Sequence, residues 1–351
     1  MRQFLILANK RYHTDFRKYL MRAAQRAGAR ALHIYCWENI ILSRNGSEYQ
    51  LYGNDVPVEK LRDEIETYFE GKPFVALTGL GCNENWIATR LQETLTNGVF
   101  GYDVYDDLLF DSAGCDRIER MLQDCIWRAR CDFQILLNKD LSDRYPGASH
   151  LDNASHMTKV KPAPRSQDRL VYVGSIDNRV DFDWLRAAAS TGVDLHIYGR
   201  IHLGSPTVEQ RLNQLTATCS NVVYYGEYDN DDLWSILRQY SIGLLPYKVG
   251  DRLTRFINPD KLYHYLNSSL EVLASPISQV TPYARFLHLV EENDDWVSAI
   301  RSTARDQRAA AWPRAEFTWD TRWRQLLAIV NQTNEQALLA GNPDDQSSER
   351  H

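Results

Sequence analysis

INPDKLYHYLNSSLEVLASP, residues 257–276, reads as a loop, a helix, a tight turn and a strand. Asn258 and Pro259 suit a helix start, since proline lacks the N–H group that would have no partner there. Apolar residues recur at helical spacing over 262–266, and 270–274 is an apolar run typical of a short buried strand. The stretch therefore predicts one helix-to-strand unit of an α/β sheet.

Cations gather immediately before this predicted helix. An apolar strand run at 242–247 precedes it, and the loop between them holds Arg252, Arg255 and Lys261. Cations beside a helix N-terminus, at the ends of parallel strands, favour a bound diphosphate. An ordinary solvated loop fits the spacing equally well, so spacing alone leaves both interpretations open.

On both sides of this stretch, short apolar runs typical of strands alternate with segments in which apolar residues recur at helical spacing. In the C-terminal half, we predict strands at 170–173, 195–198, 222–225, 242–245, 272–274 and 286–290, with helices near 181–190, 207–217, 230–240, 261–267 and 318–332. In the N-terminal half, we predict strands at 4–8, 31–35, 74–79 and 133–137, another ending within 101–107, a hairpin of 40–43 with 49–52, and helices at 15–28, 58–69, 85–95 and 116–130. This rhythm predicts Rossmann-like parallel sheets.

A chain of 351 residues is long for a single hydrophobic core, so two domains are expected. A proline-rich polar segment at 157–166 suits a linker. We expect a first domain over 1–160, a second over 167–316, a helix over 317–340 that can cross back to the first, and a disordered tail over 341–351.

Composition limits the function classes. Hydrophobic residues at 44% and charged residues at 25% describe a soluble globular protein, and a net charge of −6 argues against a nucleic-acid partner. The six cysteines form no C-x-x-C pair, which fits reduced thiols, and no apolar run approaches the ~18 residues of a spanning helix. We expect a cytoplasmic protein, soluble or peripheral on the inner face of the membrane.

Three cations lie four residues apart in the predicted N-terminal helix. Lys18, Arg22 and Arg26 would form one basic stripe on its surface. Such a stripe is usually a solvated helix face. The alternative is docking to an anionic membrane, whose surface attracts such cations.

Lys261, Leu262, Tyr265 and the strand through Val272 resemble the donor-site segment of bacterial GT-B glycosyltransferases. The most similar family is that of the xanthan-type glucuronosyltransferases of exopolysaccharide assembly. The resemblance implies an α/β GT-B fold, in which two Rossmann-like domains face each other across a cleft. The first domain would bind the acceptor and the second the nucleotide sugar.

The implied activity is transfer of a sugar from a nucleotide-diphosphate donor, expected to be a UDP-sugar, to a glycan or a lipid-linked saccharide in polysaccharide biosynthesis. The nucleotide sugar is the substrate, and no further cofactor is implied. This chain departs from the family pattern at Ser269, where glycine is usual, and at Glu271, where proline is usual. A sugar-nucleotide epimerase of the same fold and a non-catalytic sugar-binding or scaffold protein therefore stay open.

The expected donor contacts follow from strand ends in the second domain. The run through Val173 ends in a glycine turn, where backbone can approach a ligand. Tyr247 could stack on a base and Glu227 could accept hydrogen bonds from a ribose. The predicted donor-binding residues are Gly174, Ser175, Ile176, Glu227, Tyr247, Asn258, Asp260, Lys261 and His264.

The expected mechanism is inverting and independent of a metal. The two positions that carry glutamates in the largest retaining GT-B family are Phe256 and His264 here, and neither is acidic. An inverting enzyme would take its base from the first domain. The carboxylate cluster that begins at Asp103 lacks the Asp-x-Asp spacing of a metal-binding transferase, and Lys261 can neutralise the phosphates. The candidate catalytic bases are Asp103, Asp106, Asp107 and His13, of which Asp107 and Asp106 are favoured over His13.

Overall fold

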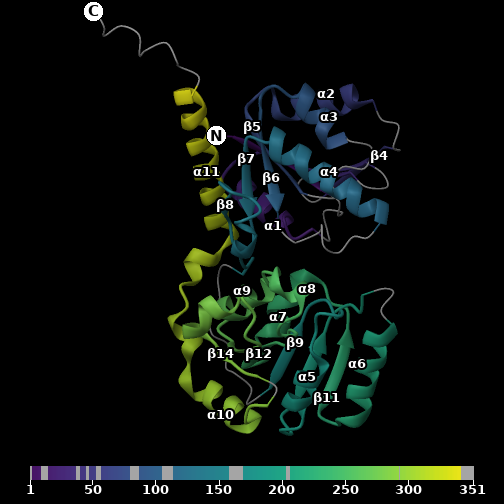
Figure 1. The fold of residues 1–351 in the computed structure, drawn as a ribbon, viewed down its shortest axis with the longest axis vertical. Coiled ribbons are helices and arrows are strands. Elements are labelled where there is room, and N and C mark those ends of the chain that lie inside the picture. Colours follow the sequence, from purple (N-terminus) through teal and green to yellow (C-terminus); the bar gives the residue numbers. More distant parts are fainter. Residues whose placement is uncertain are drawn as a thin grey trace, which may run out of the picture. The chain divides into compact units, whose positions relative to one another are not determined.

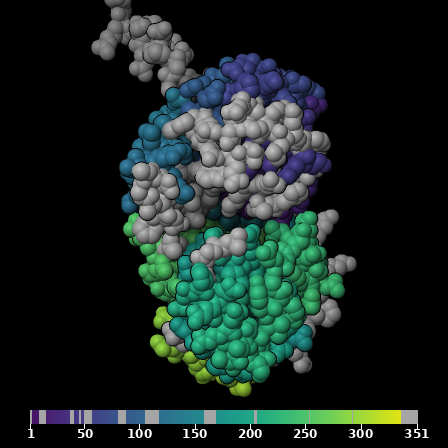
Figure 2. Space-filling view, turned by 90° about the vertical axis from the view of Figure 1, so that its right-hand side faces the viewer, coloured from purple at the N-terminus to yellow at the C-terminus, as the bar shows by residue number. Residues whose placement is uncertain are grey.

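A computed structural model describes residues 2–8, 15–36, 40–44, 47–52, 57–79, 87–104, 114–157, 169–202, 206–291 and 293–340. The chain separates into two compact units, which we call the first unit (residues 1–152 and 319–351) and the second unit (residues 153–318). Figure 1 shows the helices and strands of each unit, and Figure 2 shows one face of the atomic surface, coloured by residue number.

The first unit is built on a sheet in the order β4-β3-β2-β1-β5-β6-β7-β8. Neighbouring strands run parallel except for β2-β3-β4 at one edge, which pair antiparallel. The hairpin of β3 with β4 was predicted, whereas the antiparallel pairing of β2 with β3 was not. Because the chain leaves β1 on one side and returns at β5 on the other, the strand order reverses between β1 and β5. The strands are β1 (Gln3–Ala8), β2 (Ala31–Cys36), β3 (Ile40–Arg44), β4 (Ser47–Tyr52), β5 (Phe74–Gly79), β6 (Gly98–Val104), β7 (Phe133–Leu136) and β8 (Ser149–His150).

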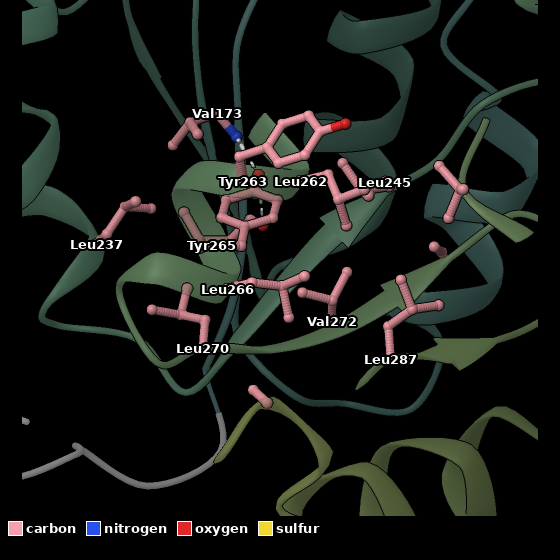
Figure 3. Close-up of a cluster of buried hydrophobic side chains, with 14 of the residues drawn as sticks. Val173, Leu237, Leu245, Leu262, Tyr263, Tyr265, Leu266, Leu270, Val272 and Leu287 are labelled. Atoms are coloured by element: carbon pink, nitrogen blue, oxygen red, sulfur yellow. Dashed lines mark hydrogen bonds between the residues drawn. The ribbon is translucent and has the colours of Figure 1, made fainter. Parts of the chain in front are cut away.

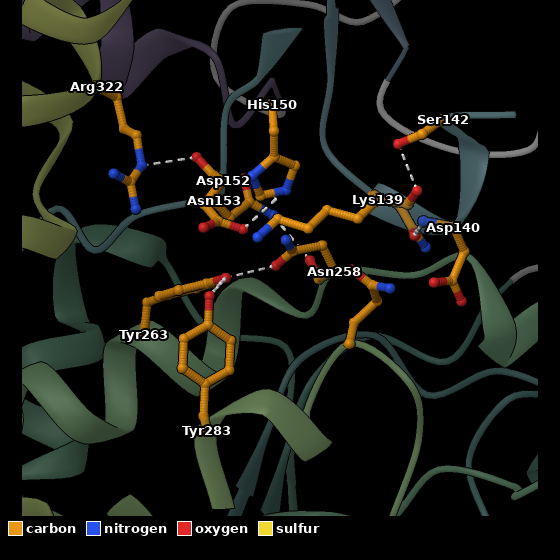
Figure 4. Close-up of polar contacts among 12 residues, drawn as sticks. Lys139, Asp140, Ser142, His150, Asp152, Asn153, Asn258, Tyr263, Tyr283 and Arg322 are labelled. Carbon is orange, nitrogen blue, oxygen red and sulfur yellow. Dashed lines mark hydrogen bonds and ion pairs between the residues drawn. The ribbon is translucent and has the colours of Figure 1, made fainter. Parts of the chain in front are cut away.

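Among the described residues, five helices cover this sheet, and the last of them returns from the C-terminal end of the chain. Trp323 of that helix packs its ring 5.0 Å from Phe4 of β1. Arg322 donates from Nε to the Asp152 carbonyl oxygen at 2.9 Å (Figure 4). The helices are α1 (Lys18–Arg26), α2 (Val58–Phe69), α3 (Ile87–Thr94), α4 (Gly114–Arg130) and α11 (Trp319–Ala340).

The predicted basic stripe on α1 is wrong for its first member. Lys18 is only 5% exposed, and its Nζ lies 5.2 Å from the centre of the Tyr19 ring. Arg26 is exposed, but its guanidinium donates to Asp320 of α11 at 2.7 and 3.0 Å. Because α1 packs against both the sheet and α11, its cations do not form one continuous surface.

The second unit contains a parallel sheet in the order β11-β10-β9-β12-β13-β14, which is the Rossmann order. Its strand order reverses between β9 and β12. The strands are β9 (Leu170–Val173), β10 (Leu195–Tyr198), β11 (Val222–Gly226), β12 (Ile242–Leu245), β13 (Glu271–Ala274) and β14 (His288–Leu289).

Both faces of this sheet are covered, because alternate strand residues enter two different cores. Leu170 and Tyr172 pack with residues of α5 and α6. Val171 and Val173 pack with residues of α7 and α9, and Figure 3 shows Val173 in this second cluster. The helices of this unit are α5 (Phe182–Ala189), α6 (Pro206–Thr218), α7 (Leu233–Leu237), α8 (Arg252–Arg255), α9 (Asp260–Asn267) and α10 (Trp296–Asp306).

The loop-helix-turn-strand prediction for 257–276 is confirmed by α9 and β13. Ser269 adopts the left-handed conformation that glycine usually supplies, with φ of 62°. Its hydroxyl accepts a hydrogen bond from Arg314 Nη2 at 2.8 Å. Glu271 is buried at the start of β13 and accepts from the Ala309 N–H at 3.2 Å. Neither departure from the family pattern disrupts the turn.

The remaining differences from the predicted elements are in the last strand, in the last helix and in three elements that were not predicted. The strand predicted at 286–290 pairs only over β14, because a 3-10 helix occupies Thr281–Phe286 with Pro282 in its first turn. The last helix continues to Ala340, since the residues of 335–340, EQALLA, are good helix formers. The sequence patterns did not indicate β8, α8 or α10. None of the helices in the described part of the chain is long and apolar enough to cross a bilayer.

Candidate functional site

Two glycines bring the ends of β9 and β10 into close backbone contact. Gly174 and Gly199 follow these strands with φ of 129° and 147°. A Cβ atom on residue 199 would lie 1.8 Å from the Gly174 carbonyl oxygen, so only glycine fits there. The sequence prediction included Gly174 and missed Gly199, although both follow a tyrosine- or valine-ended strand run.

Lys261 extends from the first turn of α9 to the point where the strand order reverses. Its Nζ donates to the hydroxyl of Tyr172 at 3.2 Å and to that of Tyr247 at 3.0 Å. The Lys261 side chain also lies against Gly174, where an added Cβ would be 2.7 Å from Nζ. Three predicted residues, Gly174, Tyr247 and Lys261, therefore meet at the carboxyl ends of β9 and β12.

The Lys261 ammonium is a buried charge whose hydrogen-bond partners are two phenols. Burial disfavours the ammonium, but electrostatic interactions with Tyr172 and Tyr247, and then with Asp260, outweigh this and hold the pKa of Lys261 well above its usual value. Within the described residues, no carboxylate forms an ion pair with it. Buried charges in proteins are normally paired, so this ammonium is suited to an anionic ligand.

The tyrosines that surround Lys261 are themselves fixed. Tyr172 donates to the Ser175 carbonyl oxygen at 2.6 Å, and burial raises the pKa of its phenol to about 12 despite the Lys261 charge. The Tyr265 hydroxyl accepts from the Val173 N–H at 2.9 Å, as Figure 3 shows. These bonds tie α9 to the end of β9, so the position of Lys261 is determined by the core.

An ion pair that the sequence analysis missed lies in the loop after β9. Arg179 donates from Nε to both carboxylate oxygens of Asp177 at 3.1 Å, and its Nη2 lies 2.5 Å from Oδ2. Burial alone would raise the pKa of Asp177, but the hydrogen bonds from Arg179 lower it below its usual value. The signal in the sequence was two opposite charges, two residues apart, shortly after a strand and a glycine.

Three further predicted donor-binding residues follow strand ends, but the contacts given for them do not involve Lys261. Glu227 is exposed and forms an ion pair of 3.6 Å with Arg200. The Ile176 side chain is buried in the core under α5 and α6, so it offers no side-chain contact to a donor. Ser175 is exposed, and its carbonyl accepts the bond from Tyr172.

Asn258 fixes the loop before α9. Its Oδ1 accepts from the Tyr263 hydroxyl at 2.9 Å, and its carbonyl accepts from Asn153 Nδ2 at 2.9 Å (Figure 4). Asn258 therefore anchors the segment that enters the second unit.

His264 is buried on the side of α9 that faces this entering segment. Its Nδ1 lies 3.1 Å from Ser155 Oγ, and its ring packs edge-on against His156 at 4.8 Å. Burial and the neighbouring Lys261 charge lower the pKa of His264 to about 3, so the ring is neutral at pH 7. Asp260, half exposed, lies 3.9 Å from His264 Nε2.

In the first unit, Asp103 is held in a buried ion pair near the end of β6. Arg17 donates to it from Nε and Nη2, both at 2.6 Å. Burial raises the pKa of Asp103, Arg17 opposes this, and Asp15 adds to the rise. A carboxylate bound in this way is poorly suited to take a proton from an acceptor. The candidate bases His13, Asp106 and Asp107 lie outside the described residues.

Comparison with known proteins finds no matching family model and no matching curated sequence. Solved structures do match. An α-glucosyltransferase bound to UDP and DNA has a TM-score of 0.64 at 10% identity, over 94% of this chain and 99% of that one. AviGT4, a glycosyltransferase of avilamycin A biosynthesis, has a TM-score of 0.62 at 11% identity, over 97% and 98%. The chain has the GT-B fold.

Other GT-B structures extend this comparison. The pneumococcal O-GlcNAc transferase GtfA, solved with UDP and GlcNAc, has a TM-score of 0.53 at 12% identity. The match covers 84% of this chain but only 62% of GtfA. A UDP-N-acetylglucosamine 2-epimerase from Rickettsia bellii shares the fold with a TM-score of 0.51 at 9% identity. GT-B proteins thus include both transferases and epimerases, and the fold alone does not separate them.

Proposed function

We propose that this protein is a glycosyltransferase that takes a sugar from a nucleotide-diphosphate donor bound by the second unit. The observation that supports this most is the buried Lys261 ammonium, which lies beside Gly174 and has no carboxylate partner among the described residues. In open α/β sheets, ligands bind outside the carboxyl ends of the strands where the strand order reverses. We expect the diphosphate to accept hydrogen bonds from Lys261.

Lys261 would act in transfer as well as in binding. When the acceptor oxygen forms its bond to the anomeric carbon, the bond from that carbon to the diphosphate breaks and negative charge grows on the leaving group. A fixed ammonium stabilises this charge without reorganisation, because the phenols of Tyr172 and Tyr247 already hold it in place. The same positive charge serves the role of a divalent ion, which is why we propose a metal-independent reaction.

The acceptor and the catalytic base are assigned to the first unit. His264, at one position of the retaining glutamates, is buried and neutral, which favours an inverting displacement. Such a displacement needs a base for the acceptor hydroxyl, and we propose Asp107 or Asp106, with His13 as the alternative. The xanthan-type resemblance leads us to propose a UDP-sugar as donor and a glycan or lipid-linked saccharide of polysaccharide biosynthesis as acceptor.

Nucleotide binding tests the donor site. Thermal shifts with UDP, GDP, dTDP and CMP identify the nucleotide, and calorimetry then compares the wild type with Lys261→Ala. Loss of a charge-assisted hydrogen bond costs ~1.5–3 kcal/mol, so we expect the Kd to rise by roughly ten- to a hundredfold. Lys60→Ala, which removes an exposed cation of α2, is the control and should leave the Kd unchanged. Equal affinity in Lys261→Ala and the wild type would refute the donor site.

Product analysis separates the proposed transferase from its alternatives. A transferase releases free nucleotide together with the transferred or hydrolysed sugar. An epimerase converts the nucleotide sugar to its epimer at a carbon of the ring, and a scaffold binds it without turnover. Asp107→Asn and Asp106→Asn should reduce transfer while nucleotide affinity stays the same. If both keep normal turnover and His13→Ala is inactive, His13 is the base.

A further inference from the structure

The described helices leave part of the second sheet uncovered at β10 and β11. Alternate residues, such as Leu195 and Ile197 of β10, enter the core under α5 and α6. The residues between them lie on the opposite face, where the core under α7 and α9 includes, among the described residues of these two strands, only the partly buried Tyr198. Val223 and Tyr225 of the edge strand β11 are 39% and 51% exposed (Figure 1). One edge of this sheet face is therefore open to solvent.

Aromatic rings gather on the uncovered face. The ring of Tyr225 stacks on that of Tyr198, with ring centres 4.6 Å apart and planes 6° from parallel. The ring of His196 meets that of Tyr225 edge-on, with centres 5.1 Å apart. We call His196, Tyr198, Val223 and Tyr225 the tyrosine platform. Tyrosine combines a large apolar ring with a polar hydroxyl, so an exposed stack of this kind offers both to a ligand.

A bulge in β11 sets the position of Tyr225. Ile197 of β10 pairs with Tyr224, but the next residue, Tyr198, pairs with Gly226, so Tyr225 is an extra residue between two pairs. Bulges re-aim side chains and are frequent beside functional sites. The stack of Tyr225 on Tyr198 is therefore a feature of the backbone and does not depend on a chance side-chain rotamer.

The buried Tyr240 holds the His196 ring in place. Its hydroxyl lies 2.8 Å from His196 Nδ1 and 2.9 Å from the hydroxyl of Tyr198. Burial, and then the charge of Arg169, lower the pKa of His196, so the ring is neutral at pH 7. Its other nitrogen, Nε2, forms no hydrogen bond within the described residues and is accessible to solvent. Nε2 can therefore bond to a ligand on the platform.

The charged residues at the ends of these strands are paired. Arg169 and Asp194, before β9 and β10, lie 3.7 Å apart, and Arg200 and Glu227, after β10 and β11, lie 3.6 Å apart. A nucleic acid also stacks its bases on tyrosines, but its phosphates need cations that are not already paired with carboxylates. The platform therefore suits an uncharged ligand.

We propose that the tyrosine platform binds an uncharged saccharide chain, one sugar ring of which lies against Tyr225. The C–H groups of a sugar ring pack on an aromatic ring, and the hydroxyl groups at its rim need hydrogen-bond partners such as His196 Nε2 and the Tyr225 hydroxyl. This site is separate from the donor site, because Lys261 lies at the ends of β9 and β12. The proposal does not depend on the sugar-transfer activity.

Native electrophoresis of the full chain, in gels that contain a neutral polysaccharide, tests the proposal. Dextran, pullulan, galactomannan and hydroxyethylcellulose are used separately, and the retardation of the band gives a Kd. We expect at least one of them to retard the wild type. Tyr225→Ala should raise that Kd roughly tenfold, because the stacking surface is lost. Tyr225→Phe keeps the ring and should raise the Kd by less than about threefold. His196→Ala should raise it by more than Tyr225→Phe does.

The matched control is Val297→Ser, which removes an exposed apolar side chain of α10 in the same unit. This variant should migrate as the wild type does in every gel, and all variants should keep the wild-type melting temperature. Nucleotide affinity, measured separately, reports on the donor site alone. Failure of all four polysaccharides to retard the wild type overturns the proposal, as does equal retardation of the wild type and Tyr225→Ala. A wild-type dimer that dissociates in Tyr225→Ala, without retardation by any polysaccharide, assigns the platform to self-association and also overturns it.

Discussion

Lys261 and Gly174 are in such close contact that a side chain at residue 174 would displace the end of the Lys261 side chain. A Cβ atom on residue 174 would lie 2.6 Å from Cε and 2.7 Å from Nζ of Lys261. The glycine also has a φ of 129°, which side chains rarely tolerate. One glycine thus allows both the turn after β9 and the position of the buried ammonium.

Gly174→Ala should therefore displace the Lys261 ammonium. We expect the affinity for the bound nucleotide to fall at least tenfold, and the free energy of unfolding to fall by ~1–3 kcal/mol because of backbone strain. Calorimetry and urea denaturation measure the two effects. Gly250→Ala is the control, since Gly250 has a φ of 76° and nothing within 4 Å of an added Cβ. It should lose stability only, and unchanged nucleotide affinity in Gly174→Ala would contradict the prediction.

Breaking the buried pair of Arg17 and Asp103 should destabilise the first unit strongly. Asp103→Asn leaves the guanidinium buried without its counter-ion, so we expect the free energy of unfolding to fall by ~3–5 kcal/mol. Replacing both residues, Arg17→Met with Asp103→Leu, removes both charges and should cost less than Asp103→Asn alone. Urea denaturation of the three proteins provides the comparison.

The exposed pair of Arg26 and Asp320 is the control for that experiment. These side chains are 53% and 42% exposed, so solvent screens their attraction. Arg26→Ala should lower the free energy of unfolding by less than about 1 kcal/mol. Similar losses in Arg26→Ala and Asp103→Asn would show that burial does not govern the strength of these pairs.

His264 should make the protein less stable at acidic pH. Its pKa is about 3 in the folded chain and ordinarily 6.5, so between these values the unfolded state binds a proton that the folded state excludes. Above pH 6.5, His264 is neutral in both states and does not lower the free energy of unfolding. Below pH 6.5, this free energy falls by about 1.4 kcal/mol per pH unit, which is roughly 2 kcal/mol by about pH 5.

His264→Asn removes this titration and can still accept a bond from Ser155. The loss of stability between about pH 7.5 and about pH 5 should therefore be smaller in the variant by ~2 kcal/mol. Urea denaturation at the two pH values measures the difference, and the other histidines cancel because both proteins contain them. An identical pH dependence would mean that His264 is protonated in the folded protein.

Ser269 should tolerate glycine better than alanine. Both substitutions remove the hydrogen bond from Arg314, but only glycine also relieves the strain of the left-handed conformation. We expect Ser269→Gly to be more stable than Ser269→Ala by about 1 kcal/mol in urea denaturation. Alanine equal to or better than glycine would show that the turn carries little strain.

The order of helices and strands could be predicted from the sequence because its signals are local. Apolar runs, helical periodicity and turn residues act over a few positions, and they located most strands of both sheets and the start of α9. Lys261 was recognised for the same reason, since the loop, helix and turn around it are contiguous. The sequence pattern did not distinguish the short β14 from the 3-10 helix before it, because only pairing with the sheet shows where the strand begins.

Contacts between distant residues were decided by tertiary packing. Arg17 and Asp103 lie 86 positions apart, and only the parallel register of the sheet and the placement of α1 bring them together. For the same reason, neither the burial of Lys18 nor the contact of Gly199 with Gly174 could be predicted from local patterns. The strands β10 and β11 were predicted, but only their bulged pairing stacks Tyr225 on Tyr198. Local propensity determines which elements form, whereas the energy of burial determines which of their faces meet.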